Sequence, residues 1–293
     1  MKPAAFEYFR PGSLDEALAL LAEHGGDAKP LAGGQSLIPA MNFRLATPAV
    51  LVDLNGISEL SYIKNDAADV RIGGMTRQRM VERSGIVSDQ VPLIAETMPH
   101  IAHPAIRNRG TIGGSLAHAD PAAELPAVMV AVNAHLTVSS RAGAREVEAD
   151  EFFVGLFSTA VQPGELLTEI RISPPASRSG FAFQEISRRH GDFALVGVAA
   201  VVSLDTGGNC ADARIALLSV GDRPMRAVEA AKILAGQRPS PNAIAAAADA
   251  AATKDIDPSS DIHASARYRR HLAKVLTRRV LTRAFERANV TLA

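Results

Sequence analysis

The sequence is poor in cysteine, in long apolar runs and in excess charge. Its 293 residues contain one cysteine, Cys210, which excludes an internal disulfide and any cysteine-ligated iron–sulfur cluster built by this chain alone, since such a cluster needs about four thiolates. The longest apolar run, 194–204, is far shorter than the roughly 20 residues that span a bilayer. Lys and Arg number 31, and so do Asp and Glu. A globally basic chain that attracts nucleic acid is therefore excluded.

The composition and length are typical of a folded globular chain. Hydrophobic residues make up 47% and charged residues 21%, and the length suggests about two domains. Residues 1–11 include Glu7 and Arg10 and lack the apolar stretch of a secretory signal. A cytoplasmic location is the default expectation, and any iron–sulfur cluster must belong to a partner.

Helices and strands are expected to alternate over the first 175 residues. Ser13 precedes Glu16 by three residues, which is a capping box, and apolar residues then recur at helical spacing up to Gly25. A first helix is predicted there. Apolar segments that end at turn residues predict strands at 29–32, 50–54 and 70–72, and periodicity predicts helices over 90–101 and 122–132 and a strand over 135–140.

The pattern changes near residues 173–180, where the run Pro-Pro-Ala-Ser-Arg-Ser-Gly favours turns. We place a domain boundary there. Beyond it, segments 181–186, 196–204 and 214–220 predict a short antiparallel meander, and residues from 226 onward favour helix, with an alanine-rich stretch at 243–252. The second domain is therefore predicted to be a sheet followed by helices.

Two glycine pairs follow expected strands: Gly33-Gly34 within 32–36 and Gly113-Gly114 within 111–115. Adjacent glycines accept positive φ, so successive backbone N–H groups can converge on an anion, and the missing side chains let a diphosphate approach. Most such pairs are only turns, and the chain has three others. Neither pair fits the G-x-G-x-x-G or P-loop pattern, which argues against the Rossmann and Walker nucleotide folds.

The surrounding motifs resemble the medium, FAD-binding subunit of molybdenum hydroxylases, a group that includes the carbon monoxide dehydrogenase and xanthine dehydrogenase families. The resemblance runs almost from end to end and rests on several ordered motifs, which are far more specific than one glycine pair. They are AGGQSL at 32–37, VDLN at 52–55, RNRGTIGGSLA at 107–117, DPAAE at 120–124, GELLTEI at 164–170 and SRRHGDFA at 187–194.

The resemblance implies an α+β fold. Residues 1–175 would form an FAD-binding domain of the PCMH, or vanillyl-alcohol-oxidase, type, with FAD between subdomains of about 1–55 and 56–175. Residues 178–290 would form a C-terminal flavoprotein domain of short antiparallel sheet and helices.

The resemblance also implies the cofactor site. Two segments would wrap the FAD diphosphate from both sides: Lys29, Pro30, Leu31, Ala32, Gly33, Gly34, Gln35 and Ser36, and Gly110, Thr111, Ile112, Gly113, Gly114 and Ser115. Glu124 would accept hydrogen bonds from the ribitol or nearby hydroxyls, and Ile101 would meet the FAD through its backbone. Leu166 or Leu167 would face the adenine. Gln184 takes a position where some relatives carry a lysine that reaches the flavin.

Two residues depart from the pattern of the family. Ser115 stands where relatives often have Asp or Asn, and Phe193 stands where the residue near the flavin varies. FAD binding survives either change. Because neighbouring hydrogen bonds and charges tune a flavin, its potential and access are the properties that these changes affect.

The leading hypothesis is an electron-transfer subunit without catalytic or metal-ligating residues of its own. A large partner subunit would carry the molybdenum–pterin centre, a small partner subunit would carry two [2Fe-2S] clusters, and FAD would pass electrons to an external acceptor. The assembly would be a heterotrimer or a dimer of heterotrimers, without nucleic acid or a membrane span. The alternatives are a stand-alone FAD oxidase or dehydrogenase, for which no convincing base is present, and a non-enzymatic binding module.

Three other sequence patterns give only weak indications of function. His100 and His103 could share a helix face, but Pro104 follows and no ligand set is completed. His118 and Asp120 lie within the FAD-binding block and are expected to pack around the cofactor. The basic helix at 263–288 is expected to be solvated or to face a partner subunit.

Overall fold

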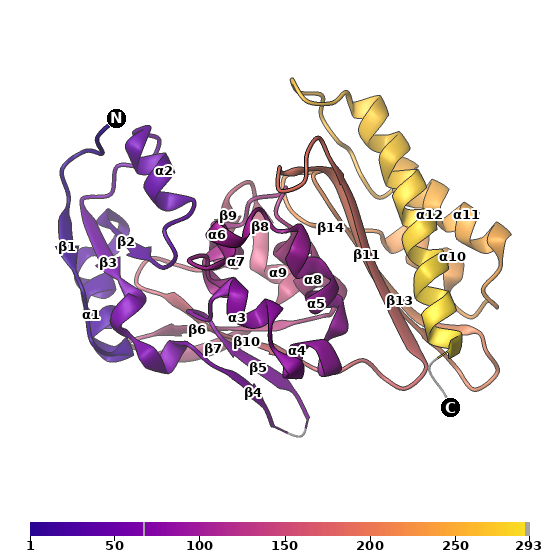
Figure 1. Ribbon diagram of the computed structural model, residues 1–293, viewed down its shortest axis with the longest axis horizontal. Helices are drawn as coiled ribbons and strands as arrows, with labels where there is room; N and C mark the ends of the chain where they lie inside the picture. The colour runs from indigo at the N-terminus through magenta and orange to yellow at the C-terminus, as the bar shows by residue number, and fades with distance from the viewer. Residues whose placement is uncertain (67, 291–293) are drawn as a thin grey trace.

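The computed structural model describes residues 1–66 and 68–290, which form three lobes in chain order (Figure 1). The N-terminal lobe, residues 7–60, holds a parallel three-stranded sheet in the order β1-β3-β2. Its elements are β1 (Glu7–Phe9), α1 (Leu14–His24), β2 (Ala28–Leu31), α2 (Leu37–Asn42) and β3 (Val50–Asp53). The predicted cap of α1 is confirmed, because the Ser13 hydroxyl accepts the Glu16 N–H at 3.3 Å. The apolar face of α1 packs on the sheet and closes a small core.

The central lobe, residues 63–172, is a five-stranded antiparallel sheet with helices packed on it (Figure 1). Its strand order is β4 (Ile63–Asn65), β5 (Val70–Gly73), β10 (Leu166–Ile172), β6 (His135–Ser140) and β7 (Gly143–Glu148), with a small hairpin of β8 (Phe153–Gly155) and β9 (Ser158–Thr159). The helices are α3 (Gln78–Glu82), α4 (Gly85–Gln90), α5 (Pro92–Thr97), α6 (Pro104–Arg107), α7 (Ile112–His118), α8 (Glu124–Ala131) and α9 (Ala149–Phe152). The predicted strand at 135–140 is confirmed.

The single helix predicted over 90–101 is wrong. The segment is divided between the end of α4, helix α5 and the 3-10 turn Met98–His100. Pro92 starts α5 and holds Val91 at φ −137°, since the residue before a proline avoids helical backbone. The helix predicted over 122–132 begins later, because the Asp120 carboxylate accepts the Ala122 N–H at 2.9 Å and forms a turn there.

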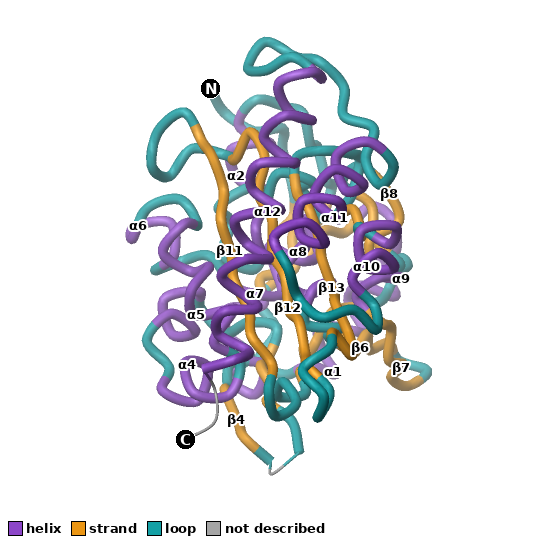
Figure 2. The backbone as a smooth tube through the Cα atoms, turned by 90° about the vertical axis from the view of Figure 1, so that its right-hand side faces the viewer, coloured by secondary structure: helices purple, strands orange, loops and turns teal. Residues whose placement is uncertain are grey.

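The C-terminal lobe, residues 179–290, is an antiparallel meander with helices on one face (Figure 2). Its elements are β11 (Ser179–Ser187), β12 (Ala194–Leu204), β13 (Cys210–Leu218), β14 (Met225–Arg226), α10 (Val228–Leu234), α11 (Pro241–Thr253) and α12 (Ala266–Val290). The predicted meander is confirmed. Its third strand ends earlier than predicted, since Ser219 takes a left-handed φ of 61° and its N–H bonds to the Pro121 carbonyl.

Strand β12 explains the longest apolar run. Val198, Ala200 and Val202 face the core under α10–α12, whereas Ala199 and Val201 face the central lobe. A strand covered on both faces is apolar at every position. None of the helices in the described ranges is long and apolar enough to span a bilayer.

Candidate functional site: two glycine loops and a buried carboxylate cluster

The structure brings the two predicted glycine loops into contact between the N-terminal and central lobes. A Cβ on Gly33 would meet the carbonyl oxygen of Arg109 and lie 2.7 Å from the Cα of Gly110. On the other side, a Cβ on Gly114 would lie 3.4 Å from the Cβ of Ala32. Only glycine at position 33 permits this backbone approach without a shift.

The first loop offers free donors. In the described part of the chain, the backbone N–H groups of Gly33, Gly34, Gln35 and Ser36 donate to no protein acceptor. Gly34 takes a left-handed φ of 72°, a conformation that glycine adopts at little cost. A run of unsatisfied N–H groups with such a turn is suited to an anion.

The second loop is built differently, because its N–H groups at residues 112–115 already donate within the protein. Ile112 donates to the Thr76 carbonyl at 3.0 Å and Gly113 donates to the Gly74 carbonyl at 2.9 Å. Gly114 donates to the Thr111 hydroxyl at 3.0 Å, and Ser115 donates to the Thr111 carbonyl at 3.2 Å, as the first turn of α7. This loop therefore shapes the wall behind the first loop, and the run of consecutive free donors lies on the first loop.

Strand β10 supports that wall. The Gly74 N–H donates to the Thr168 carbonyl at 2.8 Å, and a Cβ on Gly74 would lie 2.5 Å from the Leu167 carbonyl oxygen. The backbone of Leu167 and Thr168 thus lies directly behind Gly74, which in turn contacts Gly113. The side chains of Leu166 and Leu167 are buried, Leu166 in the core of the N-terminal lobe and Leu167 in that of the central lobe.

Glu124 opens α8 and is only 6% exposed. Burial, reinforced by the nearby Glu185 carboxylate, raises the pKa of Glu124 to about 7. His100 Nδ1 lies 3.5 Å from Glu185 Oε1, and this interaction raises the pKa of His100. The other Glu185 oxygen is buried without a hydrogen-bond partner among the described residues. Three titratable groups therefore share one polar cluster, in which the two carboxylates are buried and His100 is partly exposed.

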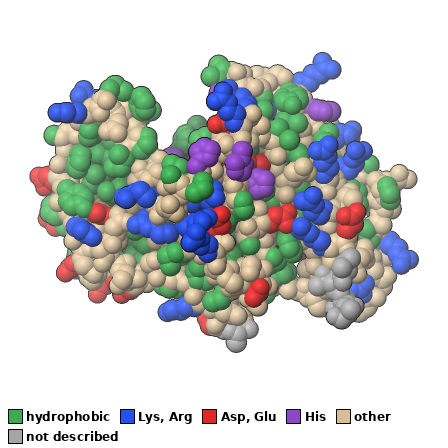
Figure 3. Space-filling view, viewed as in Figure 1, with side chains coloured by type: hydrophobic (Ala, Val, Ile, Leu, Met, Phe, Trp, Pro, Cys, Tyr) green, Lys and Arg blue, Asp and Glu red, His purple; other side chains and the backbone are tan. Residues whose placement is uncertain are grey.

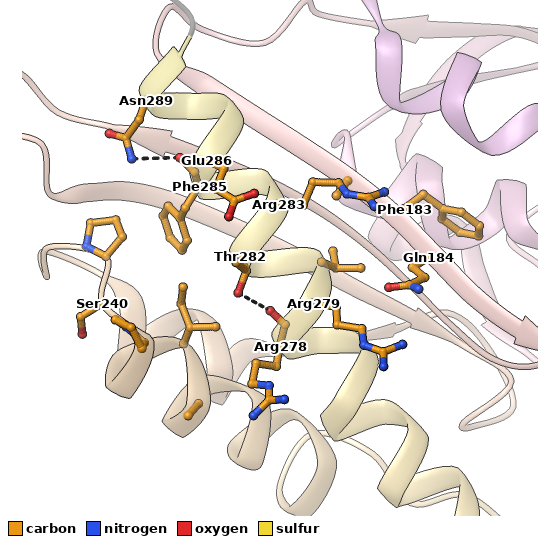
Figure 4. Close-up of a pocket in the computed structure, with 16 residues that line it drawn as sticks. Phe183, Gln184, Ser240, Arg278, Arg279, Thr282, Arg283, Phe285, Glu286 and Asn289 are labelled. Carbon is orange, nitrogen blue, oxygen red and sulfur yellow. Dashed lines mark hydrogen bonds between the residues drawn. The ribbon is translucent and has the colours of Figure 1, made fainter.

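The family resemblance names Gln184 as a cofactor-binding residue, which stays a prediction, and it does not name the neighbouring Glu185. Successive strand residues face opposite sides, so Gln184 does not join the cluster at Glu124. It lines a cavity of about 870 Å³ on the side of α12, together with Arg279 and Arg283 (Figure 4). Strand alternation on β11 was the signal that distinguishes the two residues.

The backbone of Ile101 is also engaged within the protein. Its carbonyl accepts the Arg107 Nη1–H at 2.8 Å, and Arg107 pairs with Glu82 at 3.0 Å. The left-handed Ala102 separates His100 from His103, so these histidines do not share a helix face. Nowhere in residues 1–66 or 68–290 do three or more His, Cys, Asp or Glu side chains gather as a metal-binding group.

Comparison with known proteins agrees with this geometry. A family model described as the FAD binding domain in molybdopterin dehydrogenase matches residues 4–175, and the CO dehydrogenase flavoprotein C-terminal domain matches residues 181–284. The fold and site therefore define an FAD-binding flavoprotein. The chain belongs to the medium, FAD-binding subunits of molybdenum hydroxylases, as the motifs predicted, and it is an oxidoreductase subunit.

Individual relatives cover almost the whole chain. The 6-hydroxypseudooxynicotine dehydrogenase complex subunit alpha of Paenarthrobacter nicotinovorans is 44% identical over 99% of this chain and 98% of its own length. The carbon monoxide dehydrogenase medium chain of Afipia carboxidovorans is 42% identical over 98% and 99%. A carbon monoxide dehydrogenase structure from Hydrogenophaga pseudoflava superposes with a TM-score of 0.95 at 41% identity, covering 98% of this chain and 99% of that one.

Proposed function

We propose that this chain holds FAD mainly through the first glycine loop, backed by the second, and passes electrons from a partner's [2Fe-2S] clusters to an external acceptor. The observation that carries the proposal is the run of four free N–H groups at Gly33, Gly34, Gln35 and Ser36. They face no protein acceptor in the part of the chain that the structure describes, and they adjoin the backbone of Arg109 and Gly110. Such a cradle fits a diphosphate, because N–H groups neutralise an anion without a dedicated lysine.

Bound flavin supplies the capacity to accept and release electrons, and the residues of the chain bind and orient it. We propose further predicted contacts with FAD, each on an observation of its own. Glu124 is a buried carboxyl with a pKa near 7, which can donate as well as accept a hydrogen bond to a polar group of the cofactor. Lys29, Pro30 and Leu31 lead into the first loop from β2, and Gly110 leads into the second.

The partners that we propose are a large molybdenum-cofactor subunit and a small [2Fe-2S] subunit, in a heterotrimer or a dimer of heterotrimers. Relatives named as a medium chain or as a complex subunit support this arrangement. The single cysteine also supports it, since the clusters need thiolates from elsewhere. A cytoplasmic location remains a prediction of the sequence alone. For the domains we propose 1–175, with subdomains of about 1–55 and 56–175, and 178–290; each contains its own sheet or sheets.

The names of the relatives help to indicate which subunit selects the substrate. Subunits of enzymes named for 6-hydroxypseudooxynicotine, caffeine and carbon monoxide are 44%, 42% and 42% identical to this chain. Nearly equal similarity to such different enzymes is expected of a chain that handles electrons only. We propose that the choice of substrate belongs to the large partner subunit.

The test is an absorption spectrum of the purified chain after incubation with FAD and removal of free ligand. The wild type should retain the flavin bands, and a Gly33→Val, Gly114→Val double variant should lose them while it remains folded by circular dichroism. Adding the partner subunits and a reducing substrate should then bleach the bands of the wild type. A wild type that retains no flavin, even with partners present, would refute the proposal. Substrate oxidation by the chain alone would favour the stand-alone enzyme instead.

A further inference from the structure

Arg77 lies where the two glycine loops meet. One arm of its guanidinium donates to the carbonyl of Arg109, the residue that directly precedes the second loop. The other arm donates to Asn55 Oδ1 at 2.5 Å. Asn55 in turn donates through Nδ2 to the carbonyl of Ala32 at 3.0 Å, in the first loop. A continuous path of hydrogen bonds therefore joins the loops through two side chains.

Asn55 is itself held in one orientation. The Asp53 carboxylate accepts the Asn55 backbone N–H at 2.9 Å and also a hydrogen from the Asn55 side-chain amide. Tyr8 donates its hydroxyl to the other Asp53 oxygen. Burial alone would raise the pKa of Asp53, but the hydrogen bonds from Tyr8 and Asn55 outweigh it and hold that pKa below its usual range. The amide of Asn55 thus presents its oxygen to Arg77 and its nitrogen to the first loop.

No direct ion pair among the described residues balances the positive charges of Arg77 and Arg109. Among the described residues, neither Arg77 nor Arg109 has a carboxylate within ion-pair distance. Burial and the neighbouring charge of Arg109 lower the pKa of Arg77, which Asp53 partly offsets. Figure 3 shows Lys and Arg side chains gathered where the N-terminal lobe meets the central lobe. Arg77, bonded to two neutral acceptors, and the neighbouring cation of Arg109 favour an anion beside them.

We propose that Arg77 is a positioning residue for the diphosphate of FAD. Anchored by Asn55, it ties the first glycine loop to the second, and together with Arg109 it supplies positive potential beside the free N–H groups. This inference rests on the proposed function. It extends the site beyond the glycine loops to Asn55, Arg77 and the side chain of Arg109.

The test measures the FAD dissociation constant of the full chain by fluorescence titration. Arg77→Met removes the two-armed guanidinium together with its charge, and Asn55→Ala removes the side chain that orients it. Each variant should weaken FAD binding about 10- to 100-fold. Arg77→Lys keeps the charge but cannot reproduce the two-armed geometry, and it should recover only a small part of this loss. Arg83→Met, an exposed arginine at the end of α3, is the matched control and should bind like the wild type.

The charge is tested separately with Arg109→Met, which keeps the backbone carbonyl that Arg77 uses. Binding should weaken about threefold, and its dependence on ionic strength between about 50 and 300 mM salt should become shallower than in the wild type. Urea unfolding of each variant without FAD reports whether it folds. If Arg77→Met does not fold, Asn55→Ala and Arg77→Lys decide the question.

The outcomes separate this inference from the function on which it rests. A wild type that binds no FAD would refute the proposed function itself. A wild type that binds FAD while Arg77→Met and Asn55→Ala bind within twofold of it would overturn the inference alone. Full rescue by Arg77→Lys would overturn the positioning role, and unchanged affinity and salt dependence in Arg109→Met would overturn the role of the charge.

Discussion

Gly33 and Gly110 approach each other so closely that a Cβ on Gly33 would lie 2.7 Å from the Cα of Gly110. Real Cβ atoms do not tolerate this distance, so any side chain at position 33 must push the loops apart. The two loops come from different lobes, and their contact therefore fixes how the N-terminal lobe sits on the central lobe.

Gly33→Ala should weaken FAD binding at least 10-fold and lower the free energy of unfolding by about 1–3 kcal/mol, because the added methyl group meets backbone that cannot yield easily. FAD titration and urea unfolding measure the two effects. Gly85→Ala is the control: a Cβ there meets nothing within 4 Å, at the start of α4, and alanine is a better helix former. Equal FAD affinity in both variants would contradict the loop contact.

Glu124→Gln should remove a pH dependence of stability. The folded-state pKa of Glu124 is about 7, above its ordinary value of 4.5, so between these values the folded chain binds more protons than the unfolded chain. Stability therefore falls as pH rises through this window and levels off above it. Glutamine does not titrate, so the variant should gain up to roughly 3 kcal/mol on the wild type between pH 4.5 and 7.5.

Urea unfolding of both proteins across this pH range checks the prediction. His100, whose pKa is raised by Glu185, contributes a slope of the same sign, so some pH dependence should persist in Glu124→Gln. Parallel curves for the two proteins would show that Glu124 titrates normally.

The features that the sequence predicted are those set by residues close together in the chain. The cap of α1 lies within a few residues of its partner, and the meander of the C-terminal lobe follows from alternation and turns. The glycine pairs were visible because glycine marks turns wherever they occur. The role of each pair could not be predicted from the sequence. The N–H of Gly113, for example, donates to the carbonyl of Gly74, which is distant in the sequence.

The residues that hold the loops together were missed for the same reason. Arg77 bonds to residues 22 and 32 positions away, and nothing in its local pattern distinguishes it from a surface arginine. The place of Glu185 beside Glu124 was not predicted, because a resemblance carried from relatives does not specify which face of β11 a residue occupies. Strand register, which only pairing with β12 fixes, decides this.

Arg107→Met should destabilise the central lobe. Arg107 is 5% exposed, pairs with Glu82 through two bonds of 3.0 and 3.1 Å, and donates to the Ile101 carbonyl. Its loss takes two hydrogen bonds from the Glu82 carboxylate, which keeps Arg79 at 2.7 Å, and one from the Ile101 carbonyl, so the cost should be about 2–4 kcal/mol. Urea unfolding checks this, with Arg83→Met as the exposed control; a loss below about 1 kcal/mol would contradict the prediction.

Glu96→Gln should loosen the attachment of the C-terminal lobe. Glu96, on α5, accepts the Phe183 N–H of β11 at 3.0 Å and the Arg287 Nη1–H of α12 at 2.6 Å. A neutral amide keeps one acceptor but loses the charge, so we expect a loss of about 1–2 kcal/mol. Hydrogen exchange should quicken at β11 and α12 and stay unchanged at β1–β3, because the carboxylate joins only the former elements to α5. Uniformly faster exchange in all three lobes would show instead that Glu96 acts on global stability.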